Sequence, residues 1–92
     1  MTTIKQGDGK FYVGEDEQHP LAEITFQEKD HLVVDHTYVS EELRGQGMAA
    51  KLVEKVVGYA RDEQKKIDPK CDYTEKKLKE TPEYHDVLLE ND

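Results

Sequence analysis

An arginine and two glycines stand directly before the longest helical pattern in this sequence. The stretch RGQGMA begins at Arg44 and ends at Ala49. The first amide groups of a helix have no partner within the helix, and the helix dipole favours negative charge at that end. Glycines in the turn let the backbone approach a bulky anion without a Cβ in the way. These residues predict a binding site for a pyrophosphate, with the planar, charged guanidinium of Arg44 adding hydrogen-bond donors. The alternative is a loop whose glycines only turn the chain.

Such a binding site needs a strand before it and a helix after it, and the sequence predicts both. Residues 46–63 carry apolar side chains at helical spacing, with charged residues on the opposite face. Residues 31–40 are rich in β-branched and aromatic side chains, which is typical of a long central strand. Residues 21–27 alternate, with Ala22, Ile24 and Phe26 on the face expected to be buried.

Shorter segments complete the predicted fold. Two extended runs, residues 3–6 and 10–13, flank the turn GDGK, and a strand at 66–69 precedes a second, shorter helix at 72–80. A strand–helix–strand crossover places the last strand parallel to the strand before the helix. The expected fold class is therefore α/β (α+β). It comprises a mixed sheet with antiparallel N-terminal strands, a Gly-rich turn into a long helix, a parallel crossover strand and a short C-terminal helix, in one domain over residues 1–92.

Composition excludes several classes of function. The net charge of -8, from 21 acidic and 13 basic side chains, argues against binding to nucleic acid or to an anionic membrane surface. A cationic partner fits this balance better. The single cysteine excludes an internal disulfide, and the N-terminal residues lack a signal-peptide pattern, so we expect a cytoplasmic protein. The histidines show no metal-ligand spacing with one another or with that cysteine, so we expect no metal site.

The spacing of Arg44, Gly47 and Ala49 is similar to the acyl-CoA signature of the GNAT superfamily of N-acetyltransferases, in which Gln or Arg is followed by Gly and then by Gly or Ala. The segment DHTYVSEELRGQGMAAKLVEKVVGYARDE, followed by KIDPKCDY and TPEYHDV, resembles the small single-domain GNAT-like acetyltransferases. That family carries H-T-x-V before the Gly-rich turn, P-x-C after the helix and P-E-Y near its end. The resemblance covers roughly residues 22–88.

The resemblance implies an N-acetyltransferase that uses acetyl-CoA and transfers its acetyl group directly to an amine in a ternary complex. It places the pantetheine of coenzyme A along residues 37–39 and the pyrophosphate on residues 46–49. The expected cofactor-binding residues are Thr37, Tyr38, Val39, Arg44, Gly45, Gln46, Gly47, Met48, Ala49 and Tyr73. The chain has no room for the helices that cover the acceptor in larger members. The acceptor, a small molecule or a protein lysine, is therefore not implied, and a monomer or weak dimer is expected. The alternative is a non-catalytic acyl-CoA-binding module that needs a partner protein.

Two side chains are the candidates for chemistry at the thioester. Cys71 follows the strand that should splay from the cofactor-bearing strand. It is a nucleophile or redox-sensitive thiol, a residue that merely lines the site, or an inert buried residue. His36 can act as a base, directly or through water. The alternative is a structural histidine whose ring is hydrogen-bonded to a neighbouring residue. Simple alternation places His36 on the same strand face as Leu32, Val34 and Tyr38.

Overall fold

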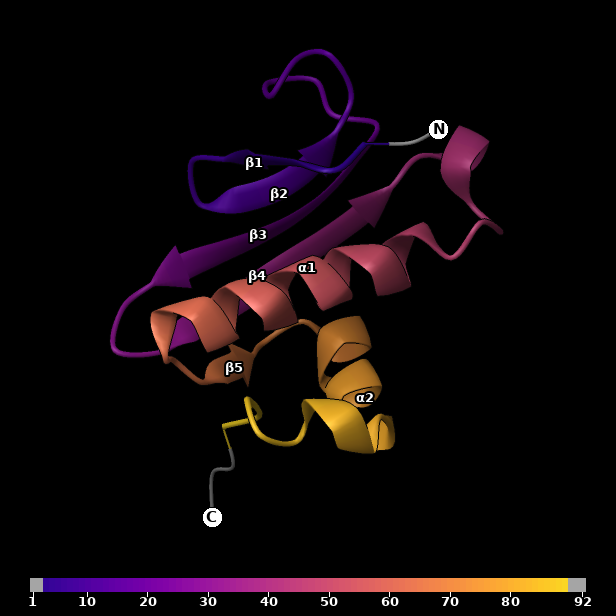
Figure 1. The fold of residues 1–92 in the computed structure, drawn as a ribbon. Helices are drawn as coiled ribbons and strands as arrows, with labels where there is room; N and C mark the ends of the chain where they lie inside the picture. Colours follow the sequence, from indigo (N-terminus) through magenta and orange to yellow (C-terminus); the bar gives the residue numbers. More distant parts are fainter. Residues whose placement is uncertain (1–2, 90–92) are drawn as a thin grey trace.

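The computed structural model describes residues 3–89, so residues 1–2 and 90–92 of the predicted domain lie outside the described part. Its sheet has five strands in the order β1-β2-β3-β4-β5. These are β1 (Lys5–Gly7), β2 (Lys10–Val13), β3 (Ala22–Glu28), β4 (Leu32–Val39) and β5 (Ile67–Pro69). Strands β1 to β4 pair antiparallel, whereas β5 pairs parallel to β4. The predicted mixed sheet is confirmed (Figure 1).

Helix α1 (Met48–Glu63) crosses one face of the sheet (Figure 1). Its apolar stripe is fully buried against the strands, as the helical spacing predicts. The helix begins two residues later than expected because Gly47 has φ +71°, a left-handed conformation that cannot continue a right-handed helix. Helix α2 (Asp72–Glu80) follows β5 directly, in the place predicted for the shorter helix.

An irregularity in β4 changes which side chains share a face. Thr25 of β3 pairs with His36, but the next residue, Phe26, pairs with Val34, so Asp35 is an extra residue in β4. Such a bulge reverses the alternation of side chains beyond it. His36 therefore lies on the face away from α1, and the predicted grouping of His36 with Val34 is wrong.

The side chain that follows His36 points the other way. Thr37 pairs with Ile24, which is fully buried beneath α1. Since directly paired residues share a face of the sheet, Thr37 belongs to the helix-covered side. The bulge thus brings a threonine, rather than the histidine, toward the helices.

An aromatic cluster closes the core between the hairpin of β1 and β2 and the middle of α1. The rings of Phe11 and Phe26 lie 5.9 Å apart, and Tyr59 of α1 packs edge-on against Phe11 at 6.0 Å. The Tyr59 hydroxyl donates a hydrogen bond of 2.6 Å to Glu28 at the end of β3. The ring is thus packed on one side and anchored by its polar end on the other.

This hydrogen bond predicts a measurable titration. Because Tyr59 donates to the Glu28 carboxylate, its pKa is raised from 10.0 to about 12. The raised pKa favours the neutral phenol in the fold, so its stabilisation is fully present below pH 10 and is lost as the pH rises through the folded pKa. In an NMR titration of the Tyr59 ring, Glu28→Gln is expected to move the midpoint down toward the ordinary value. An unchanged midpoint contradicts this assignment.

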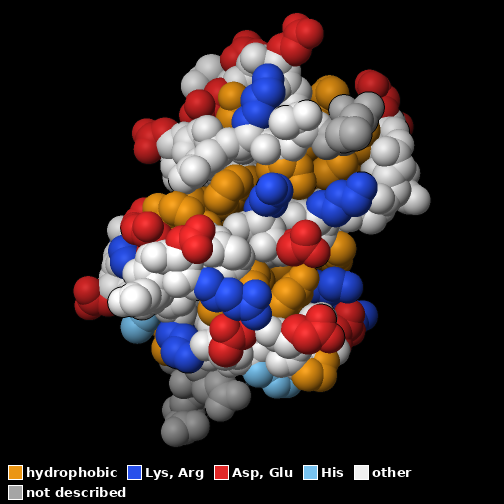
Figure 2. Space-filling view, in the orientation of Figure 1, with side chains coloured by type: hydrophobic (Ala, Val, Ile, Leu, Met, Phe, Trp, Pro, Cys, Tyr) orange, Lys and Arg blue, Asp and Glu red, His pale blue; other side chains and the backbone are white. Residues whose placement is uncertain are grey.

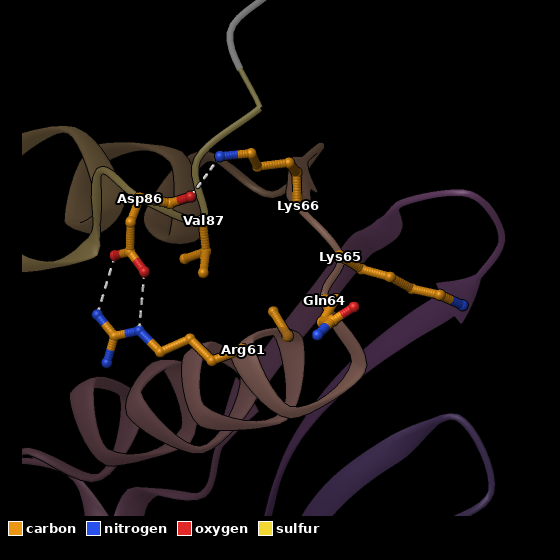
Figure 3. A pocket seen from close by; sticks show the side chains of 7 residues that line it. Arg61, Gln64, Lys65, Lys66, Asp86 and Val87 are labelled. Atoms are coloured by element: carbon orange, nitrogen blue, oxygen red, sulfur yellow. Dashed lines mark hydrogen bonds and ion pairs between the residues drawn. The ribbon is translucent and has the colours of Figure 1, made fainter.

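The C-terminal segment is tied back to α1 and β5. Arg61 of α1 meets Asp86 through two hydrogen bonds, of 3.0 and 2.9 Å, and also donates to the backbone carbonyl of Glu83. Figure 3 shows this pair, together with Lys66, which donates to the backbone carbonyl of Asp86. The guanidinium holds the pKa of Asp86 below its ordinary value. Leu88 bridges to Ile67 in parallel beside β5.

The surface carries both signs of charge. Figure 2 shows Lys and Arg side chains interspersed with Asp and Glu over the face of the molecule that carries the helices. No helix within residues 3–89 combines the length and the apolar character needed to cross a membrane.

Candidate functional site

A groove of about 190 Å³ lies where the end of β4, the start of α1 and the first turn of α2 meet. It is lined by Val39, Leu43, Arg44, Gly45, Gly47, Met48, Ala49, Ala50 and Tyr73. Seven of the residues expected to bind the cofactor are in this lining, drawn from three different elements. Gln46, Thr37 and Tyr38 were expected there too but are not part of it.

The two glycines give the groove its shape. Gly45 and Gly47 have φ of +84° and +71°, which side-chain-bearing residues rarely adopt. A Cβ placed on either glycine would meet no other atom within 4 Å, so the space beside them is open. Glycine is therefore favoured here by backbone conformation, and the open space leaves room for a ligand against the backbone.

The start of α1 is suited to an anion. Lys51 is the first residue whose amide donates to the carbonyl at the helix entrance, Gly47 O, at 3.1 Å. The amides of Met48, Ala49 and Ala50 precede it and have no partner within the helix. The first turn of α1 carries no acidic residue, so the positive end of its dipole is not neutralised from within the helix.

Arg44 has a structural contact as well as a charge. Its Nε donates a hydrogen bond of 3.1 Å to the carbonyl of Val39, the last residue of β4. The side chain is otherwise exposed at the rim of the groove. Gln46, whose side chain donates to Glu42 O at 3.2 Å, is turned back onto the short 3-10 helix η1 (Glu41–Leu43). This contact explains why Gln46 is outside the lining.

The second half of β4 has an open edge beside the groove. In the described part of the chain, β5 pairs with β4 only at Leu32–Val34. The amides of Lys70 and Cys71 then both donate to Val34 O, and the chain turns into α2. Because Ser40 N donates to β3 at Leu21 O, strand alternation directs the backbone groups of residues 37 and 39 toward this open edge. The Val39 carbonyl accepts from Arg44, and the other groups at this edge are open to an extended ligand.

Tyr38 lies apart from this edge. It pairs with Glu23 on the sheet face away from α1, and 40% of its surface is exposed. Among the residues expected to bind the cofactor, Tyr38 is thus the one whose side chain points to the far side of the sheet.

Cys71 stands where β5 and β4 diverge. It occupies the N-cap position of α2 and is partly buried, and its Sγ lies 3.5 Å from Thr37 Oγ1. Partial burial raises the pKa of this thiol, but hydrogen bonding from Thr37 and from the backbone of Thr74 and Tyr73 outweighs it, so the pKa is lowered overall. The surroundings therefore favour the thiolate.

The two predicted catalytic side chains lie on opposite sides of the sheet. Cys71 contacts Thr37, whose side chain is on the α1 side, whereas His36 is on the outer face beside Thr25. They do not form a hydrogen-bonded pair, and any shared role requires each to reach the open edge of β4 from its own side.

Sequence reasoning missed three residues of this region. Leu43 and Ala50 line the groove, and Thr74 of α2 lies 3.4 Å from Thr37. Ala50 carries a local signal, because it continues the run of small residues after Gly47. Thr74 precedes the buried Leu78 by four residues, which places both on one helix face, but only tertiary structure reveals its contact.

Comparison with known protein families and solved structures agrees with this architecture. A sequence profile described as GCN5-related N-acetyl-transferase matches residues 10–87, which is most of the chain. The chain belongs to the GCN5-related N-acetyltransferase family. The solution structure of a GCN5-like protein from Staphylococcus aureus, a candidate N-acetyltransferase, superimposes with a TM-score of 0.80 and 42% identity. That match covers 98% of this chain and 90% of the other.

A more distant solved structure that aligns with this chain is a ribosomal-protein-alanine N-acetyltransferase from Brucella melitensis biovar Abortus 2308. It aligns with a TM-score of 0.47 and 17% identity, over 95% of this chain and 69% of that one. A search of the curated proteins gave no significant match.

Two other kinds of site are alternatives to the groove at the start of α1: a metal site and the cavity beside Arg61. Within residues 3–89, no three or more His, Cys, Asp or Glu side chains are grouped so as to hold a metal ion. The cavity of about 310 Å³ beside Arg61 is larger than the groove, but Arg61, Lys65 and Lys66 there are each bonded to an acidic residue or a carbonyl. The groove at the start of α1 is the better candidate for an anionic ligand.

Proposed function

We propose that this chain is an acetyl-CoA-dependent N-acetyltransferase that transfers an acetyl group directly to an amine in a ternary complex. The observation that carries the proposal is the arrangement of groups along the second half of β4. The groove, with the open helix amides and Arg44, lies at the end of this strand, and Cys71 lies beside Thr37, two residues before Val39 of the groove lining. This order of groups suits a long ligand with phosphates at one end and an amide-bearing arm at the other.

Each part of the groove has a role in this proposal. The amides of Met48, Ala49 and Ala50, with Arg44, hold the negatively charged phosphates. The backbone at Thr37 and Val39 receives the amide-bearing arm as an added strand would be received. Acetyl-CoA supplies the acetyl group as a thioester, and a backbone amide near Val39 donates a hydrogen bond to its carbonyl oxygen in this proposal. Tyr73 packs against the ligand from α2.

The acceptor is an amine of unidentified structure. Transfer requires the amine in its neutral form, so a base or water must take its proton. His36 on the outer face remains our candidate for that proton, since an acceptor can approach the open edge of β4 from the side opposite α1. The excess of acidic side chains favours a cationic acceptor through long-range attraction.

A binding module is the competing function, and one observation favours it. Strands β1 and β2 are joined by only two residues, Asp8 and Gly9, so no helix follows the first strand to cover an acceptor. A partner protein would then complete the site. In that case the domain binds acetyl-CoA but does not consume it alone.

Turnover separates the two functions. Purified protein is incubated with acetyl-CoA and a panel of small amines and lysine peptides, and free CoA is measured by chromatography. We expect amine-dependent release of CoA that is lost when His36 is replaced by alanine, with binding retained. Binding without release for any amine would favour the module, and absence of binding would contradict both.

A further inference from the structure

Two threonine hydroxyls from different elements meet at the thiol of Cys71. Thr37 Oγ1 of β4 lies 3.5 Å from Cys71 Sγ and 3.4 Å from Thr74 Oγ1 of α2. The threonine on the strand therefore contacts both the thiol and the second hydroxyl. The two threonines are 37 positions apart in the chain, so this junction exists only when α2 is packed on β4.

Burial gives the second hydroxyl a defined task. Thr74 is the one polar residue classed as buried in the described part of the chain, with an exposed fraction of 0%. A hydroxyl removed from water requires a hydrogen-bond partner, and Thr37 Oγ1 supplies it. This contact restricts the rotation of the Thr37 side chain and keeps its hydroxyl beside the sulfur.

The position of Cys71 adds the polarity of a helix end. The residue caps α2, and its own carbonyl accepts from Glu75 N at 2.9 Å, which is the first helical hydrogen bond. A side chain at this position lies near the unpartnered amides of the first turn, here those of Tyr73 and Thr74, although Sγ forms no capping hydrogen bond in this geometry. Helix starts of this kind favour an anion on the capping side chain.

We propose that Thr37 is a positioning residue for the reaction. Its hydroxyl orients the Cys71 thiol and donates a hydrogen bond to the thiolate form, while Thr74 holds that hydroxyl in place. The proton lost by the thiol goes to solvent, and no covalent step is needed. The proposal rests on the proposed function only in that Cys71 adjoins the acetyl-transfer site.

The lowered pKa of Cys71 agrees with this role of Thr37, and no charged side chain is needed to explain the shift. Hydroxyl and amide groups lower the pKa of Cys71 despite its partial burial. The charged neighbours in sequence, Lys70 and Asp72, are both exposed, and Lys70 lies 3.6 Å from Asp68. On β4, Asp35 accepts from Thr25 and belongs to the bulge, and His36 is on the outer face.

Alkylation of the thiol tests this role directly. Cys71 is the only cysteine, so its reaction with iodoacetamide reports one site, and the pH midpoint of the rate gives its apparent pKa. Thr37→Val, which keeps the shape and removes the hydroxyl, is expected to raise the midpoint by about half a unit to one unit, a change of roughly 3- to 10-fold in thiolate at fixed pH below the midpoint. Thr37→Ser should restore the native midpoint, and Thr74→Val should raise it by less.

The matched control is Thr25→Val, the same substitution at a threonine that bonds Asp35 on the outer face, which should leave the midpoint unchanged. If circular dichroism shows that Thr37→Val does not fold, Thr37→Ala against Thr25→Ala replaces the pair. A native midpoint in folded variants lacking the Thr37 hydroxyl, or equal shifts in variant and control, overturns the proposal.

The same measurement keeps this inference separate from the proposed function. Alkylation is measured in the protein without ligand, whereas acetyl-CoA binding is titrated by calorimetry in wild type. A raised midpoint in Thr37→Val together with no acetyl-CoA binding would support the action of Thr37 on the Cys71 thiol and reject the acetyltransferase. Binding and turnover with an unmoved midpoint would reject the positioning role alone.

Discussion

Replacing Gly47 with asparagine is expected to weaken acetyl-CoA binding by roughly tenfold or more, which corresponds to about 1.4 kcal/mol. Asparagine tolerates the left-handed conformation that Gly47 adopts at φ +71°, so the turn is kept. Its side chain instead enters the open space beside the start of α1. Phosphates held by the first helix amides would be displaced, and charge-assisted hydrogen bonds of this kind are among the strong ones. Calorimetric titration of acetyl-CoA measures the change.

Gly58→Asn is the matched control for this variant. Gly58 lies in the middle of α1, is exposed, and also has open space beside it, but it is not part of the groove. The same substitution there should leave acetyl-CoA affinity unchanged. Native affinity in Gly47→Asn, or an equal loss in both variants, would contradict the assignment of the anion site. Valine at Gly47 is a poorer probe, because a β-branched residue at positive φ also strains the fold.

Truncating Leu52 is expected to lower the free energy of unfolding by about 2–5 kcal/mol. The side chain is fully buried on the face of α1 that packs against the sheet. Leu52→Ala removes apolar contacts and leaves a cavity that the surrounding core fills only in part. A domain of this size has a total stability on the order of 5–15 kcal/mol, so the loss is a large fraction.

Urea unfolding followed by circular dichroism measures this effect. Lys51→Ala serves as control, since Lys51 is the exposed neighbour on the same helix and its truncation should change stability by less than about 0.5 kcal/mol. The midpoint should fall for Leu52→Ala with little change in slope. A loss below about 1 kcal/mol would show that α1 does not pack through this side chain as the structure places it.

Local sequence periodicity was sufficient for most of the fold. The helical spacing of apolar residues identified α1, and the alternation around Ile24 identified the buried face of β3, because each pattern repeats over several residues. The bulge at Asp35 had no such signal. Side chains in residues 32–39 fit a regular alternating strand, and the extra residue is visible only in the pairing with β3. Simple alternation therefore assigns His36 to the wrong face.

In the candidate site too, local features could be predicted from the sequence, whereas contacts made by tertiary packing could not. The Gly-rich turn is local, and its glycines do take the positive φ values that a close approach of the backbone needs. The junction of Thr37, Cys71 and Thr74 depends on how α2 packs against β4, and no short-range pattern encodes that packing. Tyr73 is proposed from the sequence as a side chain able to stack on the cofactor, and the packing of α2 places it in the lining of the groove.

We propose that acetyl-CoA binds in the groove between β4, α1 and α2. An NMR titration of acetyl-CoA into the isotope-labelled protein, followed through the backbone amides, tests it most directly. We expect saturable shifts that are largest at residues 45–50, at Val39 and at Tyr73. An absence of shifts, or shifts centred instead on the cavity beside Arg61 and Asp86, would contradict it.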